Sequence, residues 1–336
     1  MPSSLPRALE PGDVARYLAG VGLLADPNGA TVEELTGGVS NRAFWARWAG
    51  GGCVVKQARP RLAVQMEWLA DVRRVIREGE AMQWLRARLG GPHIPRLLHL
   101  DRERNLLVME AIPPPAENYK AILLRGKVDP ALAEQFGGLL ARIHNATMDL
   151  ESHRQFGDAT FFDELRLSPY YDTIAARHPA LAARIGALRR ECRESVFCLV
   201  HGDYSPKNIL VLHGHLILLD YEVAHFGNPS FDLGFALTHY LAKALHVPGR
   251  GPAFIDAARR FWGTYRGQAR IAPEAIAHAG QHLAAILLAR MDGKSPLEYF
   301  TDPERKRTVR EISARTLNDD AARIEDVIEA VEAELT

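Results

Sequence analysis

The residues of this chain best suited to chemistry lie in one stretch, residues 198–235. Asp203 follows a short apolar run, in a segment whose glycine and proline disfavour regular structure. Asn208 comes five residues later, and two short apolar runs joined by a His-Gly-His turn then lead to Asp220. Because a strand hairpin returns its end to near its start, we expect the Asp203, Asn208 and Asp220 side chains to face one small volume.

Two carboxylates and an amide in that arrangement suit phosphoryl transfer. The reaction requires a protein mainly to position groups, to hold Mg2+ against phosphates and to accept the proton of a hydroxyl. A loop carboxylate can accept the proton, and the oxygens of an amide and a second carboxylate are hard ligands for Mg2+. The simpler alternative is that Asp203 and Asn208 stabilise a turn while Asp220 caps a helix. The ordered set of three favours the chemical interpretation.

Motifs in this stretch resemble those of the aminoglycoside phosphotransferase and choline kinase superfamily, small-molecule kinases with a protein-kinase-like fold. The Asp-x-Glu form of the metal motif is similar to that of methylthioribose kinases and choline kinases, whereas aminoglycoside phosphotransferases typically have no acid at the third position. The matching stretches are HGDYSPKN at 201–208, LDYE at 219–222 and FDLG at 231–234.

The resemblance implies a role for each matching residue. Asp203 would be the catalytic base, and Asn208 and Asp220 would hold Mg2+. Glu222 would assist the metal. Asp232 would brace the catalytic loop by accepting backbone N–H bonds, which is a structural role.

A second group of candidates lies upstream, in residues 31–56. The pattern predicts strand, glycine turn, strand, glycine hairpin and strand, the last ending at Lys56. Gly37 and Gly38 would let backbone N–H groups approach phosphates, and Ser40 could add a hydroxyl, although a plain hairpin is the simpler alternative. Lys56 could reach the α and β phosphates of ATP from the end of its strand.

The spacing of charged and apolar residues predicts a helix over residues 71–89. This helix is similar to the one that carries the ion-pair partner of the phosphate-binding lysine in aminoglycoside phosphotransferases. Alignment on Trp84 and Leu85 favours Glu78 over Glu80 as the partner of Lys56. A Lys-Gln-Ala run that begins at Lys56 is also similar to one in methylthioribose kinases.

An apolar strand ending near Met109 meets three consecutive prolines, which predicts a hinge. By resemblance, the backbone of Glu110 to Ile112 binds the adenine edge, with Met109 behind it; a simple linker is the alternative. The expected fold is α+β, a bilobal protein-kinase-like arrangement. An ATP-binding lobe with an antiparallel sheet would occupy residues 1–112, and a mostly helical catalytic and acceptor-binding lobe would occupy residues 113–336.

Composition narrows the class of partner and the compartment. The 336 residues contain 41 Lys plus Arg and 41 Asp plus Glu, so no basic excess points to nucleic acid or to an anionic membrane. The three cysteines are few and odd in number, and no signal or membrane-spanning pattern is present. We therefore expect a cytoplasmic monomer or homodimer that uses ATP and Mg2+.

The expected activity is transfer of the γ-phosphoryl group of ATP to a hydroxyl of a small molecule. The acceptor could be a sugar-like metabolite, an aminoglycoside or other antibiotic, or an amino alcohol. An aminoglycoside site should be strongly acidic, and a choline site needs an aromatic cage. The aromatic candidates for a cage are Tyr170, Tyr171, Trp262 and Tyr265. Arg290, Asp292 and Lys294 are candidate acceptor contacts or else form a solvated interhelical turn.

Two alternatives belong to other functional classes. One is a nucleotide-binding pseudokinase or scaffold without turnover, which a missing catalytic member would indicate; in this sequence each member is present. The other is a protein kinase. The His-Gly-Asp motif in place of His-Arg-Asp, and the lack of an activation segment running from Asp-Phe-Gly to Ala-Pro-Glu, argue against it.

Overall fold

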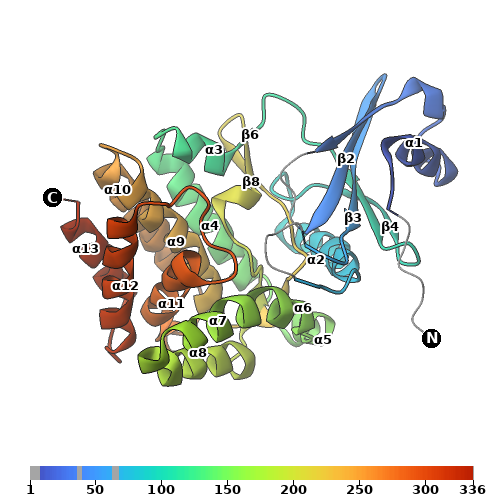
Figure 1. Cartoon of the computed structure of the whole chain (residues 1–336). Helices are drawn as coiled ribbons and strands as arrows, with labels where there is room; N and C mark the ends of the chain where they lie inside the picture. The colour runs from blue at the N-terminus through green and yellow to red at the C-terminus, as the bar shows by residue number, and fades with distance from the viewer. Residues whose placement is uncertain (1–7, 36–39, 63–67, 336) are drawn as a thin grey trace. The chain divides into compact units, whose positions relative to one another are not determined.

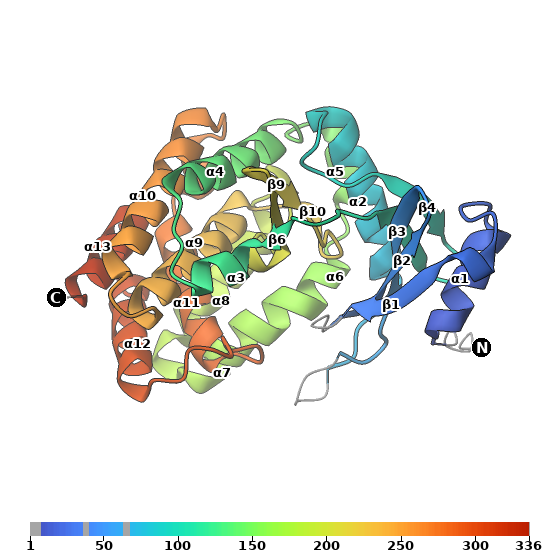
Figure 2. The same cartoon turned by 90° about the horizontal axis from the view of Figure 1, so that it is seen from above.

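The computed structural model describes residues 8–35, 40–62 and 68–335. The chain divides into two compact units, Met1–Pro114 and Pro115–Thr336. The first is built on an antiparallel sheet and the second is mostly helical (Figures 1 and 2), so the predicted α+β class is confirmed. Within the described ranges, every helix is too short or too polar to cross a bilayer. Cys53, Cys192 and Cys198 are buried free thiols.

The first unit contains a five-stranded sheet in the order β1-β2-β3-β5-β4, with every neighbouring pair antiparallel. Lys56 lies on the central strand, where it pairs with Ala43 on one side and Leu107 on the other. Gly37 and Gly38 lie outside the described residues. The strands are β1 (Thr31–Leu35), β2 (Asn41–Trp48), β3 (Gly51–Ala58), β4 (Leu97–Asp101) and β5 (Leu106–Glu110).

Two helices cover the sheet, one on each face (Figures 1 and 2). Helix α1 (Pro11–Gly20) shares an apolar core with one face, which includes Val55. Helix α2 (Arg74–Leu89) contacts β3, β4 and β5. Because successive side chains of a strand point to opposite faces, Lys56 points away from α1 and towards α2.

The apolar spacing of residues 14–21 predicts a helix with Asp13 as its N-cap, and the start of α1 differs from this prediction. The helix begins at Pro11 with Glu10 as N-cap, and Asp13 occupies the third helical position. Its carboxylate accepts the Glu10 backbone N–H at 3.1 Å, closing a reciprocal capping box. Pro11 is tolerated in the first turn of the helix because the N–H group that proline lacks would have no intrahelical partner there.

The second unit is a packed set of helices with two small strand pairings. Four of its helices pack in a row. Helix α4 contacts α10, α10 contacts α9, and α9 contacts α11. Strand β7 pairs with β10, and β6, β8 and β9 form a three-stranded sheet. The strands are β6 (Glu117–Asn118), β7 (Cys198–Val200), β8 (Ile209–Leu212), β9 (His215–Leu218) and β10 (His225–Gly227). The longer helices are α4 (Pro130–Asn145), α8 (Ala182–Glu194), α9 (Pro229–His246), α10 (Gly251–Gln268), α11 (Ala279–Asp292), α12 (Pro303–Leu317) and α13 (Ile324–Ala333).

The segment before β7 is more broken than its sequence pattern predicts. That pattern favours a single helix from Tyr170 to Val196, but the chain forms a π-helical segment (Asp163–Asp172), then α7 (Thr173–Arg177) and then α8. The break lies at His178, whose φ of −126° and ψ of 72° are not helical. Pro179 is the cause, because a proline disfavours helical geometry in the residue before it.

Candidate active site

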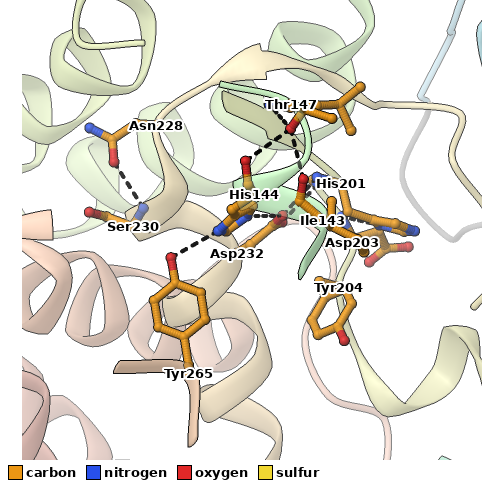
Figure 3. Close-up of polar contacts among 12 residues, drawn as sticks. Ile143, His144, Thr147, His201, Asp203, Tyr204, Asn228, Ser230, Asp232 and Tyr265 are labelled. Carbon is orange, nitrogen blue, oxygen red and sulfur yellow. Dashed lines mark hydrogen bonds and ion pairs between the residues drawn. The ribbon is translucent and has the colours of Figure 1, made fainter. Parts of the chain in front are cut away.

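The loop that follows β7 is held by one buried carboxylate, Asp232 (Figure 3). Its two oxygens accept the backbone N–H groups of His201 at 2.7 Å and of Gly202 at 2.8 Å. Asp232 lies in the first turn of α9, where the helix dipole also favours a negative charge. The bracing contact that the sequence resemblance implied for Asp232 is therefore present.

His144 supports Asp232 from behind rather than taking part in chemistry (Figure 3). Its Nε2 lies 3.5 Å from Asp232 Oδ2, and its Nδ1 lies 2.9 Å from the Tyr265 hydroxyl. The side chains of His144 and Asp232 are fully buried. This is the satisfied core histidine that is the commoner role for such a residue.

His201 links the loop to the end of the β8–β9 hairpin. The backbone N–H of Asp203 donates to its Nδ1 at 3.2 Å, so the proton belongs on Nε2, which donates to the Leu219 carbonyl at 3.1 Å. Burial lowers the pKa of His201, and this outweighs the attraction of nearby carboxylates. A neutral imidazole with a fixed tautomer therefore sets the spacing between loop and hairpin.

Gly202 is required by the backbone. Its φ is +75°, and a Cβ atom there would lie 2.9 Å from Val223 Cγ2 and 3.2 Å from the Val223 carbonyl oxygen. Any other residue would meet both a left-handed backbone penalty and a steric clash. This explains the glycine in the His-Gly-Asp motif.

Asp203 is held through one of its two carboxylate oxygens. Oδ2 accepts from Asn208 Nδ2 at 2.8 Å and lies 2.9 Å from the Arg166 guanidinium. Asn208 Nδ2 also donates to the Asp203 backbone carbonyl at 3.0 Å. These contacts leave Asp203 Oδ1 and Asn208 Oδ1 as the acceptor atoms available to a ligand.

Asp220 reaches the same place through the hairpin. The Leu219 N–H donates to the Asn208 carbonyl at 2.8 Å, which places Asp220 next to the loop. Asp220 has a φ of +70°, a left-handed conformation that is uncommon outside glycine and clusters at functional sites. Its orientation is therefore imposed by the surrounding structure.

Arg166 is the basic group about which these acids gather. Burial opposes its charge, but attraction by Asp203, together with weaker attraction by Glu222 and Asp220, raises its pKa. Its Nε also donates to the Gly202 carbonyl at 2.7 Å. Sequence reasoning missed Arg166, because it lies in a π-helical segment with no motif and no apolar periodicity.

Of the residues expected to hold magnesium, Asp220 is brought next to Asn208 by the Leu219–Asn208 backbone bond, and both Asp220 and Glu222 act on the pKa of Arg166. Among the described residues, no three His, Cys, Asp or Glu side chains form a metal site by themselves. The magnesium set differs from such a cluster because it includes an amide oxygen, that of Asn208, alongside Asp220 and Glu222. An all-oxygen donor set of this kind matches the preference of Mg2+.

The first unit, taken by itself, contains a buried ion pair. Lys56 Nζ lies 2.6 Å from Glu78 Oε1, and their side chains are 11% and 0% exposed. Glu80 instead pairs with Arg102 at 2.7 Å on the surface of the unit. Gly79 lets α2 lie close to the sheet, since a Cβ there would be 2.7 Å from Leu100 Cδ1. Of the two glutamates, the structure selects Glu78.

Ser40, which follows the glycine turn, is anchored through its backbone. Its carbonyl accepts the Arg59 N–H at 2.9 Å and Arg74 Nη2 at 2.5 Å. Arg74 is fully buried and also donates to the Arg59 carbonyl at 2.8 Å. The turn residues Gly37 and Gly38 lie outside the described ranges.

The residues expected at the adenine edge lie at the end of β5. Met109 is buried, and the Glu110 N–H donates to the Arg96 carbonyl at 2.9 Å. The Glu110 carboxylate accepts the Arg96 N–H at 3.1 Å. Ile112 lies in the irregular segment after the strand. The Glu110 N–H is therefore already engaged within the sheet.

The candidate acceptor contacts separate into different roles. The two carboxylate oxygens of Asp292 accept hydrogen bonds from Nε and Nη2 of Arg310, each at 2.8 Å. This ion pair joins α11 to α12. Of the aromatic residues, Tyr171 bonds to His282 at 2.7 Å, whereas Tyr265 bonds to His144. These two rings are committed to separate buried contacts and do not surround a common cation.

Comparison with known proteins decides the family. The sequence profile described as the phosphotransferase enzyme family matches residues 31–273, well over half of the chain. The chain belongs to this family. As a phosphotransferase family member it is 27% identical over 284 residues to methylthioribose kinase 2 of Oryza sativa subsp. japonica, covering 74% of this chain and 66% of the rice protein. A methylthioribose kinase of Yersinia enterocolitica is also 27% identical, over 278 residues, covering 74% of this chain and 69% of its own length.

Solved structures show the phosphotransferase fold. The macrolide 2'-phosphotransferase MphH of Brachybacterium faecium aligns with a TM-score of 0.55 at 20% identity, covering 93% of this chain and 99% of that one. Amicoumacin kinase hAmiN, solved with AMP-PNP, Ca2+ and its antibiotic, aligns with a TM-score of 0.54 at 14% identity, covering 92% and 89%. The predicted kinase-like fold and superfamily resemblance are confirmed.

Proposed function

We propose that this protein is a phosphotransferase that moves the γ-phosphoryl group of ATP to a hydroxyl of a small molecule. The observation that carries the proposal is Asp203, one of whose carboxylate oxygens is held by Arg166 and Asn208 while the other is uncommitted. A carboxylate held in this way can accept a proton along a fixed direction. The relatives named as methylthioribose kinases support the same reaction class.

In the proposed step, Asp203 Oδ1 orients the acceptor hydroxyl and takes its proton. The hydroxyl oxygen forms a bond to the γ-phosphorus, and the bond from that phosphorus to the oxygen bridging to ADP breaks. Lys56, kept in place by Glu78, binds the α and β phosphates. The turn at Gly37, Gly38 and Ser40 adds backbone and hydroxyl contacts to the phosphates.

The adenine edge is assigned to the end of β5. The Glu110 carbonyl accepts from the exocyclic amine, and the Ile112 N–H donates to a ring nitrogen, with Met109 packed behind the base. This assignment uses the backbone groups that remain after the Glu110 N–H has been engaged by Arg96. Because it relies on backbone groups, it tolerates side-chain changes at Glu110 and Ile112.

The residues that would hold Mg2+ are Asn208, through Oδ1, with Asp220 and Glu222. Bound there, the ion supplies positive charge against the phosphate oxygens. Asn208 turns its amide nitrogen towards Asp203, so its oxygen is the atom presented to a cation. The left-handed backbone at Asp220 keeps that carboxylate at the loop.

The test combines nucleotide binding with turnover in wild type and Asp203→Asn. Calorimetry should give the same affinity for Mg-ATP in both proteins. Acceptor-dependent ATP consumption, measured with methylthioribose, ribose, kanamycin, a macrolide and choline, should fall by about 10²–10⁴ in the variant. Asp172→Asn, at an exposed acid paired with Arg189, is the matched control and should keep full activity.

Two results would contradict the proposal. Failure to bind Mg-ATP would remove the nucleotide assignment of Lys56, Asn208 and Asp220. Tight Mg-ATP binding, with equal ATP consumption by wild type and Asp203→Asn across all acceptors, would favour the pseudokinase or scaffold.

A further inference from the structure

Basic and aromatic side chains gather in the second unit around Lys243 of α9. The Lys243 ammonium donates to the Tyr299 hydroxyl and to the His239 carbonyl, each at 3.2 Å, and lies 5.1 Å from the Tyr299 ring centroid. Lys120 lies 5.8 Å from the same ring centroid. We call this group the basic cluster, and its members are Lys120, Tyr170, His239, Lys243, Arg290 and Tyr299.

The basic cluster is connected to the candidate base through Arg166. The guanidinium that binds Asp203 also lies 6.0 Å from the Tyr170 ring centroid. The Tyr170 hydroxyl in turn accepts from Arg290 at 3.1 Å. A molecule bound at Arg290 is therefore only a few side chains away from Asp203.

Helix α9 gives a second connection. The Arg166 guanidinium lies 5.7 Å from the Phe235 ring centroid, and Phe235 lies 5.7 Å from the His239 ring. Phe235, His239 and Lys243 follow at intervals of four residues, so they share one face of the helix. The rise from Phe235 to Lys243 is about 12 Å, which is the scale of a phosphorylated sugar or a somewhat larger metabolite.

The charges of the basic cluster are not balanced within the protein. Lys243 is fully buried, and burial together with Lys120 and Arg290 lowers its pKa to about 7, with Glu298 acting in the opposite direction. The His239 side chain is 4% exposed, and among the described residues its Nδ1 has no hydrogen-bond partner. A buried lysine beside further cations costs stability, so packing does not account for it.

One end of the basic cluster lies at the surface of the unit. Lys243 and His239 are buried, whereas Lys120, Arg290 and Tyr299 are partly exposed. The Glu298 side chain, which pairs with Lys120, is 67% exposed. The surface end of the cluster is therefore the side from which a ligand would approach, in place of the Glu298 contact.

We propose that the acceptor of this phosphotransferase carries an anionic group, a phosphate or a carboxylate, which the basic cluster binds while a hydroxyl of the same molecule meets Asp203. The inference rests on the proposed function and narrows its substrate class. The charges of Lys120, Lys243 and Arg290 favour an anion and repel a polycationic aminoglycoside or a quaternary ammonium. The anion would also satisfy His239 and offset the crowded charge.

The first test measures anion binding without any need to know the acceptor. Inorganic phosphate is titrated into the full chain without nucleotide, and the His239 ring signals are followed by NMR, assigned by comparison with His239→Gln. Phosphate should shift these signals in a saturable way. Its affinity should fall at least about tenfold in Lys243→Met and in Lys120→Met, as expected for loss of one charged contact. The exposed Lys127→Met is the matched control and should bind like wild type.

The second test compares acceptors that differ only in charge. Ribose 5-phosphate and ribonate should be phosphorylated with a kcat/KM at least about tenfold above that of ribose, and kanamycin should be inactive. The better of the two anions identifies the source as phosphate or carboxylate. Lys243→Met should raise KM for that anion about tenfold with little change in kcat, and should thereby remove most of the advantage of the anion over ribose.

The outcomes separate this inference from the proposed function. No phosphate-induced shift at tens of millimolar, or turnover of ribose or kanamycin equal to that of the anions, would overturn the anionic acceptor. Saturable phosphate binding that is lost in Lys243→Met supports the anion site, even if Mg-ATP fails to bind and the kinase assignment falls. Lys120→Met keeps the test decisive if Lys243→Met fails to fold, because Lys120 is the less buried of the two lysines.

Discussion

The loop that follows β7 and the basic cluster lie in the same unit but differ in how their buried charges are balanced. In the loop, Asp232 accepts two backbone N–H groups and Asp203 meets Arg166 and Asn208. In the basic cluster, Lys243 is buried beside other cations, and the acid that acts on it, Glu298, is largely exposed. The loop is internally matched, whereas the cluster is not.

This difference distinguishes charged groups that hold other residues in position from charged groups that would bind a ligand. A matched buried charge costs little and fixes geometry, so removing it should destabilise the protein. An unmatched buried cation costs stability, so removing it should stabilise the protein and impair function. The sign of the stability change therefore distinguishes the two kinds of site.

The largest effect is expected at Asp232. Asp232→Ala leaves the N–H groups of His201 and Gly202 without their acceptor and removes the partner of His144. Two charge-assisted bonds are lost, so the free energy of unfolding should fall by about 3–6 kcal/mol. Urea denaturation measures this change. A loss below about 1 kcal/mol would show that the loop does not depend on this carboxylate.

In the first unit, Lys56 and Glu78 form a buried ion pair whose members can be changed one at a time. Lys56→Met removes the charge that would bind the ATP phosphates, and kcat/KM should fall by about 10²–10³. Glu78→Gln should reduce activity in the same direction, because it releases the lysine. Steady-state kinetics with Glu80→Gln as control should show no loss, since Glu80 pairs with Arg102 at the surface. Equal losses for the two glutamate variants would remove the special role of Glu78.

Lys243 should give a stability change of the opposite sign. Its pKa is lowered from 10.5 to about 7, so below pH 7 the ammonium is charged in both the folded and the unfolded state and the full cost of burial applies. Between pH 7 and 10.5 the unfolded chain binds a proton that the folded protein does not, so wild-type stability rises with pH. The groups that face Lys243 are Lys120, Arg290, Glu298, His239 and Tyr299.

Lys243→Met should therefore raise the free energy of unfolding at pH 6–7 by about 1–4 kcal/mol. The gain should shrink towards pH 10, where the wild-type lysine is neutral when folded. Denaturation curves of both proteins across this pH range measure the effect. Destabilisation at pH 6 would place Lys243 among the matched, positioning groups and break the comparison.

The smallest effect is expected at two glycines that share the same left-handed backbone conformation. Gly202 and Gly214 have φ values of +75° and +78°, but only Gly202 has close neighbours, whereas a Cβ at Gly214 would meet nothing within 4 Å. Both alanine variants should lose about 1 kcal/mol from the left-handed backbone. Gly202→Ala should lose roughly 1–2 kcal/mol more through its clash with Val223. Thermal unfolding of the two variants isolates the packing requirement of the loop.

The chemical residues of the loop were predictable because their order is local. Asp203 and Asn208 are separated by a tight turn and Asp220 ends the next hairpin, so short-range geometry brings them together. The strand pattern around Lys56 and the helix that follows it were predictable for the same reason, since apolar periodicity reports which face is buried. The break at Pro179 should also have been foreseen from the proline alone.

What the sequence could not specify are the contacts between distant segments. Arg166 lies in a π-helical segment that carries no motif, and it contacts Asp203. Lys243 lies on α9, and it contacts Tyr299 in a later turn of the chain. For Glu78 the resemblance had already favoured the right residue over Glu80, and the packing of α2 on the sheet brings it to Lys56. The order of residues along the chain thus determined the reaction class, because its motifs are local. Only the tertiary structure decided how Asp203 is held and where unmatched charge accumulates, because both depend on long-range packing.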